Sequence, residues 1–223
     1  ICFFIYKISI PTFLNKNKLK KLLKDREYLS KFMKKDLEVR NVKDIDEYTE
    51  NNIEKSISNF TIKEKIRLIK LTNYINLIIS RAKNKSYFDS KMFNKIPWKF
   101  GIVKNNLYEQ GLPHTRNDVI ILSRKLLDNL SNSSLISTLI HEKIHIYQKK
   151  FPLDTKKFIS DKGFIKKRKR DSNIRANPDI DDYVYTDKNG NEYKAVYTKN
   201  AKKITDINYN MGNSQKYEHP YEN

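Results

Sequence analysis

The chain has 223 residues, of which 45 are Lys or Arg and 26 are Asp or Glu, so its formal net charge is +19. Only 5 residues are Gly and 6 are Pro, which argues against a disordered linker protein and against an all-β chain with many tight turns. The single cysteine, Cys2, excludes an internal disulfide and a CxxC metal site and is compatible with a reducing compartment. A large positive charge can attract nucleic acid or an anionic membrane, but charge spread along the whole chain is also typical of a solvated surface.

Residues 1–14, ICFFIYKISIPTFL, are apolar but are interrupted by Lys7 and Pro11. This run is shorter than the roughly 20 apolar residues that a membrane-spanning helix needs. It also lacks the basic start and the small-residue cleavage site of a signal peptide. We therefore predict no transmembrane segment, and because the sequence begins with Ile we expect both ends to be cut from a longer reading frame.

Helices are expected next along the chain. Residues 15–40 place Leu, Phe and Met at helical spacing among Lys and acidic residues, which predicts one amphipathic surface helix. Residues 43–59 predict a shorter helix. Thr61 and Glu64 form the capping-box pattern at the start of a strongly periodic helix. The residues of that helix that we expect to be buried are Ile66, Ile69, Tyr74, Ile75 and Ile78.

The character of the sequence changes near residue 95. Residues 96–123 contain Pro, Gly and short apolar runs, which are typical of strands and turns, and VIIL at 119–122 predicts a strand. Then Ser131, Asn132 or Ser133 can cap a helix that runs to about residue 150 and ends before a proline.

Beyond that helix we expect a charged loop and a hairpin. The loop contains the run KKRKR at 166–170, which could bind nucleic acid or act as a nuclear address, although a solvated loop is the simpler interpretation. The hairpin turns around Asn189 and Gly190. This order of elements predicts an α+β fold, with a helical region at 1–94 and a domain with a small sheet at 95–223. A prodomain, a cap over a cleft and a partner-binding arm are all compatible with the helical region.

Two of the chain's 4 histidines lie in LIHEKIHIYQ, residues 139–148. A helix advances about 100° per residue, so His141 and His145 lie on one face and can bind one ion. Glu142 lies at the edge of that face, where its carboxylate can reach a metal-bound water without being a ligand. The opposite arc is apolar except for Lys143, whose stem could carry its charge to solvent. The pattern predicts a Zn²⁺ site, although an HExxH match can also arise by chance.

The residues LISTLIHEKIHIYQ resemble the active-site helix of zincin metallopeptidases. The wider range 95–223 is similar to uncharacterised zincin-like proteins of large DNA viruses, on the stretches WKFGIVKNNLYEQGLPHTRNDVIILS, RANPDIDDYVY and YEHPYE. The resemblance implies a zincin-like fold of the gluzincin type, Zn²⁺ as the cofactor and a peptide or protein as the substrate. It also favours an intracellular location, in the host cytoplasm or the virion.

Catalytic zinc needs a third protein ligand, and the HExxHxxGxxH pattern that would supply a third histidine is absent. The resemblance to glutamate-type zincins favours Glu222, at the start of a helix that we expect to continue beyond a truncated C-terminus. Glu218, Asp179 and His219 are the other candidates, and the first two could instead hydrogen-bond a ligand histidine. His114, also a possible ligand, lies just before a strand, where it could orient substrate, stabilise an oxyanion or simply bond to the backbone of a turn.

These patterns predict a zinc metallopeptidase that hydrolyses peptide bonds. In this hypothesis His141, His145 and an acidic third ligand hold Zn²⁺, and Glu142 acts as general base. The alternative is a catalytically degenerate zincin fold whose basic surface binds nucleic acid or a membrane.

Overall fold

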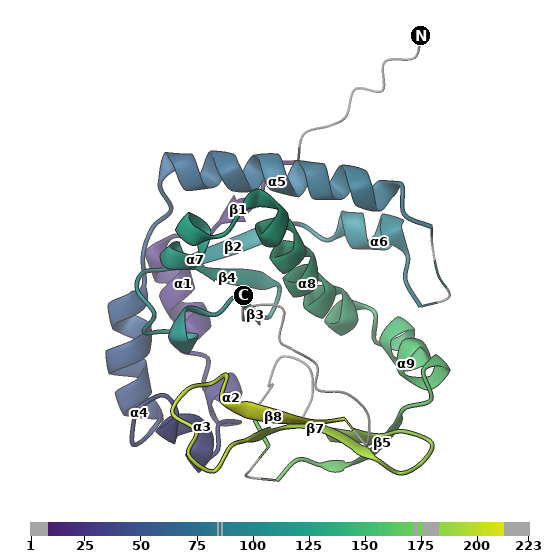
Figure 1. Ribbon diagram of the computed structural model, residues 1–223. Helices are drawn as coiled ribbons and strands as arrows, with labels where there is room; N and C mark the ends of the chain where they lie inside the picture. Colours follow the sequence, from purple (N-terminus) through teal and green to yellow (C-terminus); the bar gives the residue numbers. More distant parts are fainter. Residues whose placement is uncertain (1–8, 84, 86, 172–173, 176–182, 212–223) are drawn as a thin grey trace.

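The computed structural model describes residues 9–83, 85, 87–171, 174–175 and 183–211. In these parts of the chain, helices pack around one four-stranded sheet, and a second four-stranded sheet follows near the C-terminal end (Figure 1). Helices and strands alternate along the chain, and the strands pair both parallel and antiparallel. The α+β fold class that the sequence predicted is therefore confirmed.

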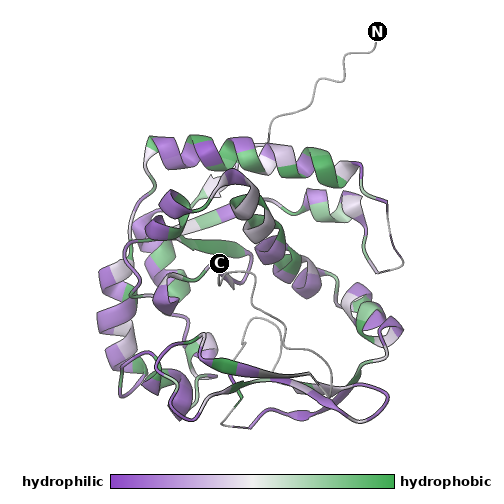
Figure 2. Ribbon diagram, viewed as in Figure 1, coloured by the Kyte–Doolittle hydropathy of each residue, from purple (hydrophilic) through white to green (hydrophobic). Residues whose placement is uncertain are grey.

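The first sheet has the strand order β1-β2-β4-β3. Its strands are β1 (Thr12–Phe13), β2 (Lys99–Val103), β3 (His114–Arg116) and β4 (Val119–Ser123). β1, β2 and β4 run parallel, whereas β3 pairs antiparallel with β4. β2 and β4 are almost wholly buried apolar runs, as expected for parallel strands covered on both faces (Figure 2). β3 lies at the edge of the sheet as the described strands form it, with β4 as its neighbour.

The N-terminal region contains short helices before one long helix. Their bounds are α1 Lys16–Leu23, α2 Arg26–Leu29, α3 Lys34–Glu38, α4 Ile45–Tyr48, a π-helical turn Thr49–Glu54, α5 Ile62–Ser80 and α6 Ser90–Lys95. The single helix expected over 15–40 is therefore wrong. The chain breaks after α1 because the Asp25 side chain accepts a hydrogen bond from the Glu27 amide and starts a new helix there. The break lets both α1 and α2 contribute leucines to the core beside β4.

α5 confirms the capping box. The Thr61 hydroxyl accepts from the Glu64 amide, and the Glu64 carboxylate accepts from the Thr61 amide at 2.6 Å. Ile75 is buried as expected, but Ile66 and Tyr74 are 47% and 52% exposed, so that part of the prediction is wrong. α5 lies across α8 and α6, and only a narrow stripe of its surface, centred on Leu68, Leu71 and Ile75, meets them (Figure 1).

The main hydrophobic core contains residues from both sides of residue 95. Leu68 and Ile75 of α5 pack in one cluster with Phe100 of β2, Ile120 of β4 and Leu139 of the histidine helix. Regions 1–94 and 95–223 thus share a core, and the first region supports the sheet and the helix that carry the histidines.

In the described part of the chain, three helices and the second sheet follow β4. α7 is Arg124–Asn129, α8 is Asn132–Lys150 and α9 is Pro152–Asp161. The second sheet is antiparallel in the order β5-β6-β7-β8, with β5 Ile165–Lys169, β6 Tyr183–Thr186, β7 Glu192–Tyr197 and β8 Ile207–Met211. β6 and β7 form the hairpin that the sequence predicted.

The charged loop expected at 166–170 is wrong, because most of the run lies on β5. Arg170 is buried at 8% exposure, donates a hydrogen bond to the carbonyl of Ile174 and lies 3.9 Å from the Asp36 carboxylate. Pairing with β6 and this buried arginine hold the run in place. None of the described helices is long and apolar enough to cross a membrane.

Candidate metal centre

The sequence of α8 explains how the helix presents its histidines. The Ser131 hydroxyl accepts from the Ser134 amide and caps the helix, as predicted. Leu135, Leu139 and Ile146 pack into the main core. Because these residues share one face, His141 and His145 are left on the opposite, more accessible side of the helix.

The two imidazoles face each other. Their Nε2 atoms are 3.1 Å apart, and the rings are nearly perpendicular with centroids 4.7 Å apart. Two nitrogens at about 2.0–2.1 Å from one tetrahedral zinc would lie about 3.3 Å apart. The two side chains therefore fit a shared zinc ion without rearrangement of the helix.

Gln148 orients the second histidine. Its Oε1 atom lies 3.2 Å from His145 Nδ1. An amide oxygen can only accept, so Nδ1 carries the proton and Nε2 keeps its lone pair, directed toward His141. Holding the far nitrogen in this way is how proteins fix the tautomer of a metal-binding histidine.

Glu142 lies beside the two histidines and is only 4% exposed. Ligand atoms of His141, Glu142 and His145 all lie within 4.8 Å of one another. The Thr115 hydroxyl, from edge strand β3, lies 2.6 Å from Glu142 Oε2 and 3.1 Å from the Glu142 carbonyl oxygen. A hydroxyl has one proton, and the carboxylate is the stronger acceptor, so Thr115 donates to Oε2 and holds the carboxylate in place.

Lys143 does not reach solvent, so that expectation is wrong. Its side chain is fully buried, with Nζ 4.0 Å from the Trp98 ring centroid and 4.7 Å from that of Phe93. Nζ has no hydrogen-bond partner among the described residues. Burial lowers the pKa of Lys143 to about 7. The residue faces the core because it follows Leu139 by one turn, where a lysine has no path to the surface.

His114 lies on β3 and faces the N-terminal helices. Its Nε2 atom is 2.6 Å from the Tyr28 hydroxyl, and its ring packs edge-on against Tyr28 and Tyr108. The side chains of His114 and Thr115 point to opposite faces of the strand, as those of neighbouring residues do, and Thr115 faces α8. Tyr28 therefore connects α2 to the strand that carries the Glu142 contact.

Glu109 lies buried behind His114. It accepts from Arg40 Nη2 at 2.5 Å and from the Tyr48 hydroxyl at 2.5 Å. Burial by itself raises the pKa of the Glu109 carboxyl, but the charges of Arg40 and His114 and these hydrogen bonds outweigh it and lower the pKa to about 2. An ionised carboxylate at this position links α4 and the segment that follows α3 to the segment before β3.

The residues predicted to complete the site have different outcomes. Glu222, Glu218, His219 and Asp179 lie outside the described residues, so the third ligand stays a prediction. In the described part of the chain, the group able to hold a metal is His141, Glu142 and His145, and His114 is not a member of it.

Sequence reasoning missed Thr115 and Gln148. Gln148 could have been found, because it follows His145 by three positions and so lies on the same face of the helix. Thr115 is adjacent to His114, but its contact spans 27 residues and depends on how β3 packs against α8.

Comparison with known families agrees with this geometry. Residues 78–173 match the model of the SprT-like family, which is related to zincin-like metallopeptidases. The matched range runs from the end of α5 through β2, β3 and β4 of the first sheet and through α8 to β5, and so includes His141, Glu142 and His145. No curated protein and no solved structure matches the chain. The similarity to a zincin-like family is thereby confirmed over this range, and the likeness to proteins of large DNA viruses stays a prediction.

Proposed function

We propose that the chain is a zinc-dependent metallopeptidase that hydrolyses peptide bonds. The observation that carries the proposal is the approach of His141 Nε2 and His145 Nε2 to 3.1 Å with the Glu142 carboxylate beside them. The SprT-like match over the same residues supports it.

Each residue has a distinct chemical task in this proposal. A zinc ion, when bound by the two histidines, supplies a Lewis acid that polarises a carbonyl and makes a water more acidic. Glu142 accepts the proton of the attacking water and passes it to the leaving amine nitrogen. Thr115 keeps the Glu142 carboxylate beside the histidines, and Gln148 keeps the lone pair of His145 directed at the ion.

The edge strand β3 can present the substrate. Among the described strands it pairs with β4 alone, and an extended peptide can add to such an edge through backbone hydrogen bonds. Because Thr115 of this strand touches Glu142, a peptide lying along β3 passes close to the proposed general base.

The test measures metal content and hydrolysis separately. Protein purified without chelators should contain about one zinc per chain and cleave fluorescently labelled casein. Glu142→Gln should keep the zinc and lose turnover, and His145→Ala should lose both. Glu50→Gln, an exposed glutamate distant in sequence, is the matched control and should behave as wild type. Hydrolysis by Glu142→Gln at the wild-type rate would refute the mechanism.

The third ligand can be assigned in the same experiment. We expect Glu222→Ala to lose the metal as His145→Ala does. Glu218→Ala, His219→Ala, Asp179→Ala and His114→Ala should retain it. Zinc lost in one of these instead would reassign the ligand to that residue.

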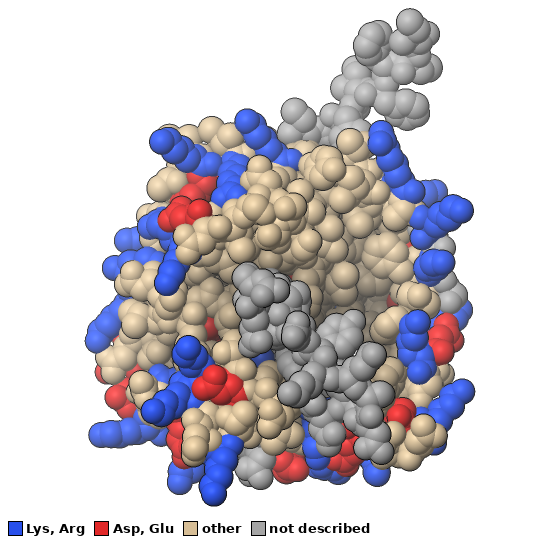
Figure 3. Space-filling view, in the orientation of Figure 1, with Lys and Arg blue, Asp and Glu red and all other residues tan. Residues whose placement is uncertain are grey.

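The alternative of a basic binding protein rests on the net charge. On the face shown in Figure 3, Lys and Arg side chains are spaced around the periphery, and uncharged side chains cover much of the part over α5 and α8. Binding to heparin that disappears at moderate salt, from a protein without zinc, would favour this alternative.

A further inference from the structure

Helix α5 carries apolar side chains on its outer face as well as on the face that enters the core. Its inner stripe, centred on Leu68 and Ile75, is buried in the main core. The first sheet, α6 and α8 lie on that inner side (Figure 1). A helix that is apolar all round is normally covered all round. In the described part of the chain, α5 is covered on its inner side, and large apolar groups of its outer side are left exposed.

The exposed apolar side chains of α5 form a continuous patch. Ile62 and Ile66 are 76% and 47% exposed, and they lie one turn apart on the same face. Ile69 and Leu77 continue this face and are half-buried. Tyr74, which precedes Leu77 by three positions, is 52% exposed. The residues recur at helical spacing, so they form one surface and are not apolar groups scattered singly.

The charge on this side of α5 is positive. Lys63 and Lys70 are exposed and lie beside the apolar patch, and Arg81 is exposed just beyond the end of the helix. The one acidic residue of α5 is Glu64, whose side chain is 10% exposed and accepts from Arg124 at 2.8 Å. The outer face of α5 is therefore both apolar and basic.

The N-terminal end of the described chain is held against the same face. The Ser9 amide donates to Asn73 Oδ1, and Asn73 Nδ2 donates to the Ser9 carbonyl, both at 2.9 Å. Asn73 follows Ile66 by two turns, so it lies on the outer face of α5. Ile10 is 74% exposed. The sequence before Ser9, ICFFIYKI, is apolar except for one lysine, so a second apolar segment begins at this face.

A lipid surface with anionic headgroups matches both properties of the face. Its phosphates attract lysines, and its hydrocarbon takes up isoleucine side chains and the ring of a tyrosine. A nucleic acid would pair with the lysines but would leave the isoleucines against a polar backbone. A second copy of the chain, related by a two-fold axis, would bring Lys63 and Lys70 of both copies together without an exposed acidic residue of α5 to pair with them.

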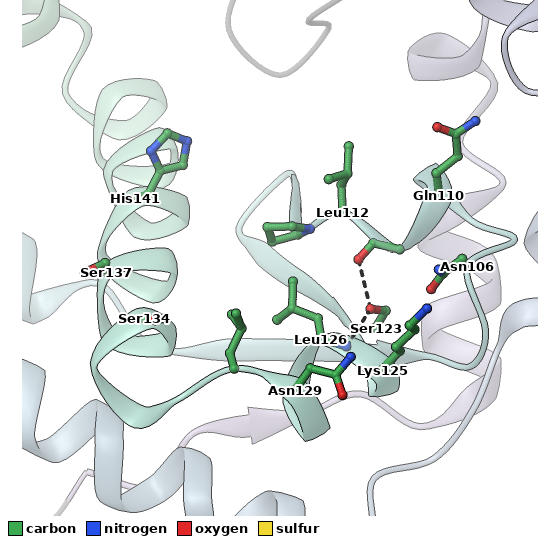
Figure 4. A pocket seen from close by; sticks show the side chains of 13 residues that line it. Asn106, Gln110, Leu112, Ser123, Lys125, Leu126, Asn129, Ser134, Ser137 and His141 are labelled. Atoms are coloured by element: carbon green, nitrogen blue, oxygen red, sulfur yellow. Dashed lines mark hydrogen bonds between the residues drawn. The ribbon is translucent and has the colours of Figure 1, made fainter. Parts of the chain in front are cut away.

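The candidate metal centre stays accessible when α5 lies on such a surface. α5 packs against the side of α8 that carries Leu139, whereas His141 lies on the opposite side of α8. A pocket of about 580 Å³ opens beside His141 on that opposite side (Figure 4). α8 therefore separates the outer face of α5 from the candidate site.

We propose that the outer face of α5 binds peripherally to an anionic lipid membrane, with Ile62, Ile66 and Tyr74 entering the boundary between headgroups and hydrocarbon and Lys63 and Lys70 contacting the headgroups. This inference goes beyond the proposed peptidase function and does not depend on it.

The test measures co-sedimentation of the full chain with lipid vesicles. Wild type should bind vesicles of phosphatidylcholine with about one third phosphatidylserine more tightly than vesicles of phosphatidylcholine alone, and added salt should reduce the difference. The double variant Ile62→Gln, Ile66→Gln should lower the partition coefficient by about tenfold or more, because two isoleucines no longer enter the hydrocarbon. Both side chains are exposed, so the variant should keep the wild-type Tm. The matched control is Leu153→Gln on α9, where the leucine is 79% exposed, and it should bind as wild type does.

The basic residues are tested separately. The double variant Lys63→Gln, Lys70→Gln should lower binding to the anionic vesicles by about tenfold or more, since each basic residue near such a surface contributes about fivefold. Its binding to vesicles of phosphatidylcholine alone should equal that of wild type.

Several results would overturn the proposal. One is vesicle binding that the isoleucine double variant leaves unchanged, or that Leu153→Gln weakens equally. Another is a wild-type chain that does not bind anionic vesicles. In that case a dimer that the isoleucine variant dissociates would assign the face to a second copy, and DNA binding that the variant weakens would assign it to nucleic acid. None of these measurements requires hydrolysis, so their outcome and that of the peptidase test are independent.

Discussion

Replacement of Glu109 by Gln keeps the shape of a buried side chain and removes its charge. Glu109 is 5% exposed and bonds to Arg40, which is 7% exposed, and to the buried Tyr48. Its pKa of about 2, against an ordinary 4.5, means that the ionised carboxylate stabilises the fold by about 3 kcal/mol, since one pKa unit corresponds to about 1.4 kcal/mol. Loss of one partner of a buried ion pair costs a similar amount, about 3–5 kcal/mol. We expect Glu109→Gln to lower the free energy of unfolding at pH 7 by about 3 kcal/mol.

The sign of the pH dependence follows from the lowered pKa. The contribution of Glu109 is fully present above pH 4.5 and is lost as the pH falls toward 2, because the unfolded chain takes up the proton first. Urea unfolding of wild type and variant should therefore show a gap of about 3 kcal/mol at pH 7 that shrinks to about 1 kcal/mol at pH 3.

The matched control is Asp46→Asn. Asp46 pairs with Arg26 at 2.6 Å, but the two side chains are 73% and 68% exposed, so its loss should cost less than about 1 kcal/mol. The reasoning is refuted if Glu109→Gln is no less stable than Asp46→Asn, or if its deficit is the same at both pH values.

Three further variants test other contacts. Thr115→Val should lower kcat by about tenfold or more with KM and zinc content unchanged, because a hydrogen bond to a charged group is worth about 1.5–3 kcal/mol. Thr115→Ser keeps the hydroxyl and should restore kcat, and an equal loss of kcat in the Ser variant would contradict a role of Thr115 in orienting Glu142. Lys143→Met should raise the free energy of unfolding at pH 7 by about 2 kcal/mol, since the buried amine has no hydrogen-bond partner among the described residues. The free energy of unfolding of the wild type should itself rise from pH 7 to 10.5, because in that range the unfolded chain binds the proton that the folded Lys143 has lost. Urea unfolding across that range measures it, and a free energy of unfolding that falls would contradict the assignment. Gly111→Ala should lower Tm more than Gly190→Ala. Both glycines have φ +82°, but an added Cβ would lie 2.5 Å from Asn106 Oδ1 at Gly111 and would meet nothing within 4 Å at Gly190. Equal losses of Tm would show that backbone strain alone sets the cost.

Local features of the chain were predictable because they depend on residues close in sequence. The spacing of His141 and His145 places both on one face of any helix, and Ser131 marks where that helix begins. The same holds for the capping box at Thr61 and for the hairpin around Gly190. In each case the partners are at most a few residues apart, so geometry within one element decides the outcome.

Burial and long-range contacts were decided only by the tertiary structure. Periodicity identified the helix at α5 but misjudged Ile66 and Tyr74, because the exposed side depends on how α5 crosses its neighbours. Periodicity also suggested that the Lys143 side chain could reach solvent, but the packed core encloses it completely.

The candidate site divides in the same way. The sequence by itself determined the pair of histidines and the glutamate between them. Only the packing of β3 against α8 brought the Thr115 hydroxyl to Glu142, and only the arrangement of α7, α8 and the segment before β3 formed a pocket next to His141. A hydrogen bond or a cavity between elements requires their relative positions, which arise from the burial of a shared core and are not encoded in the spacing of any one segment.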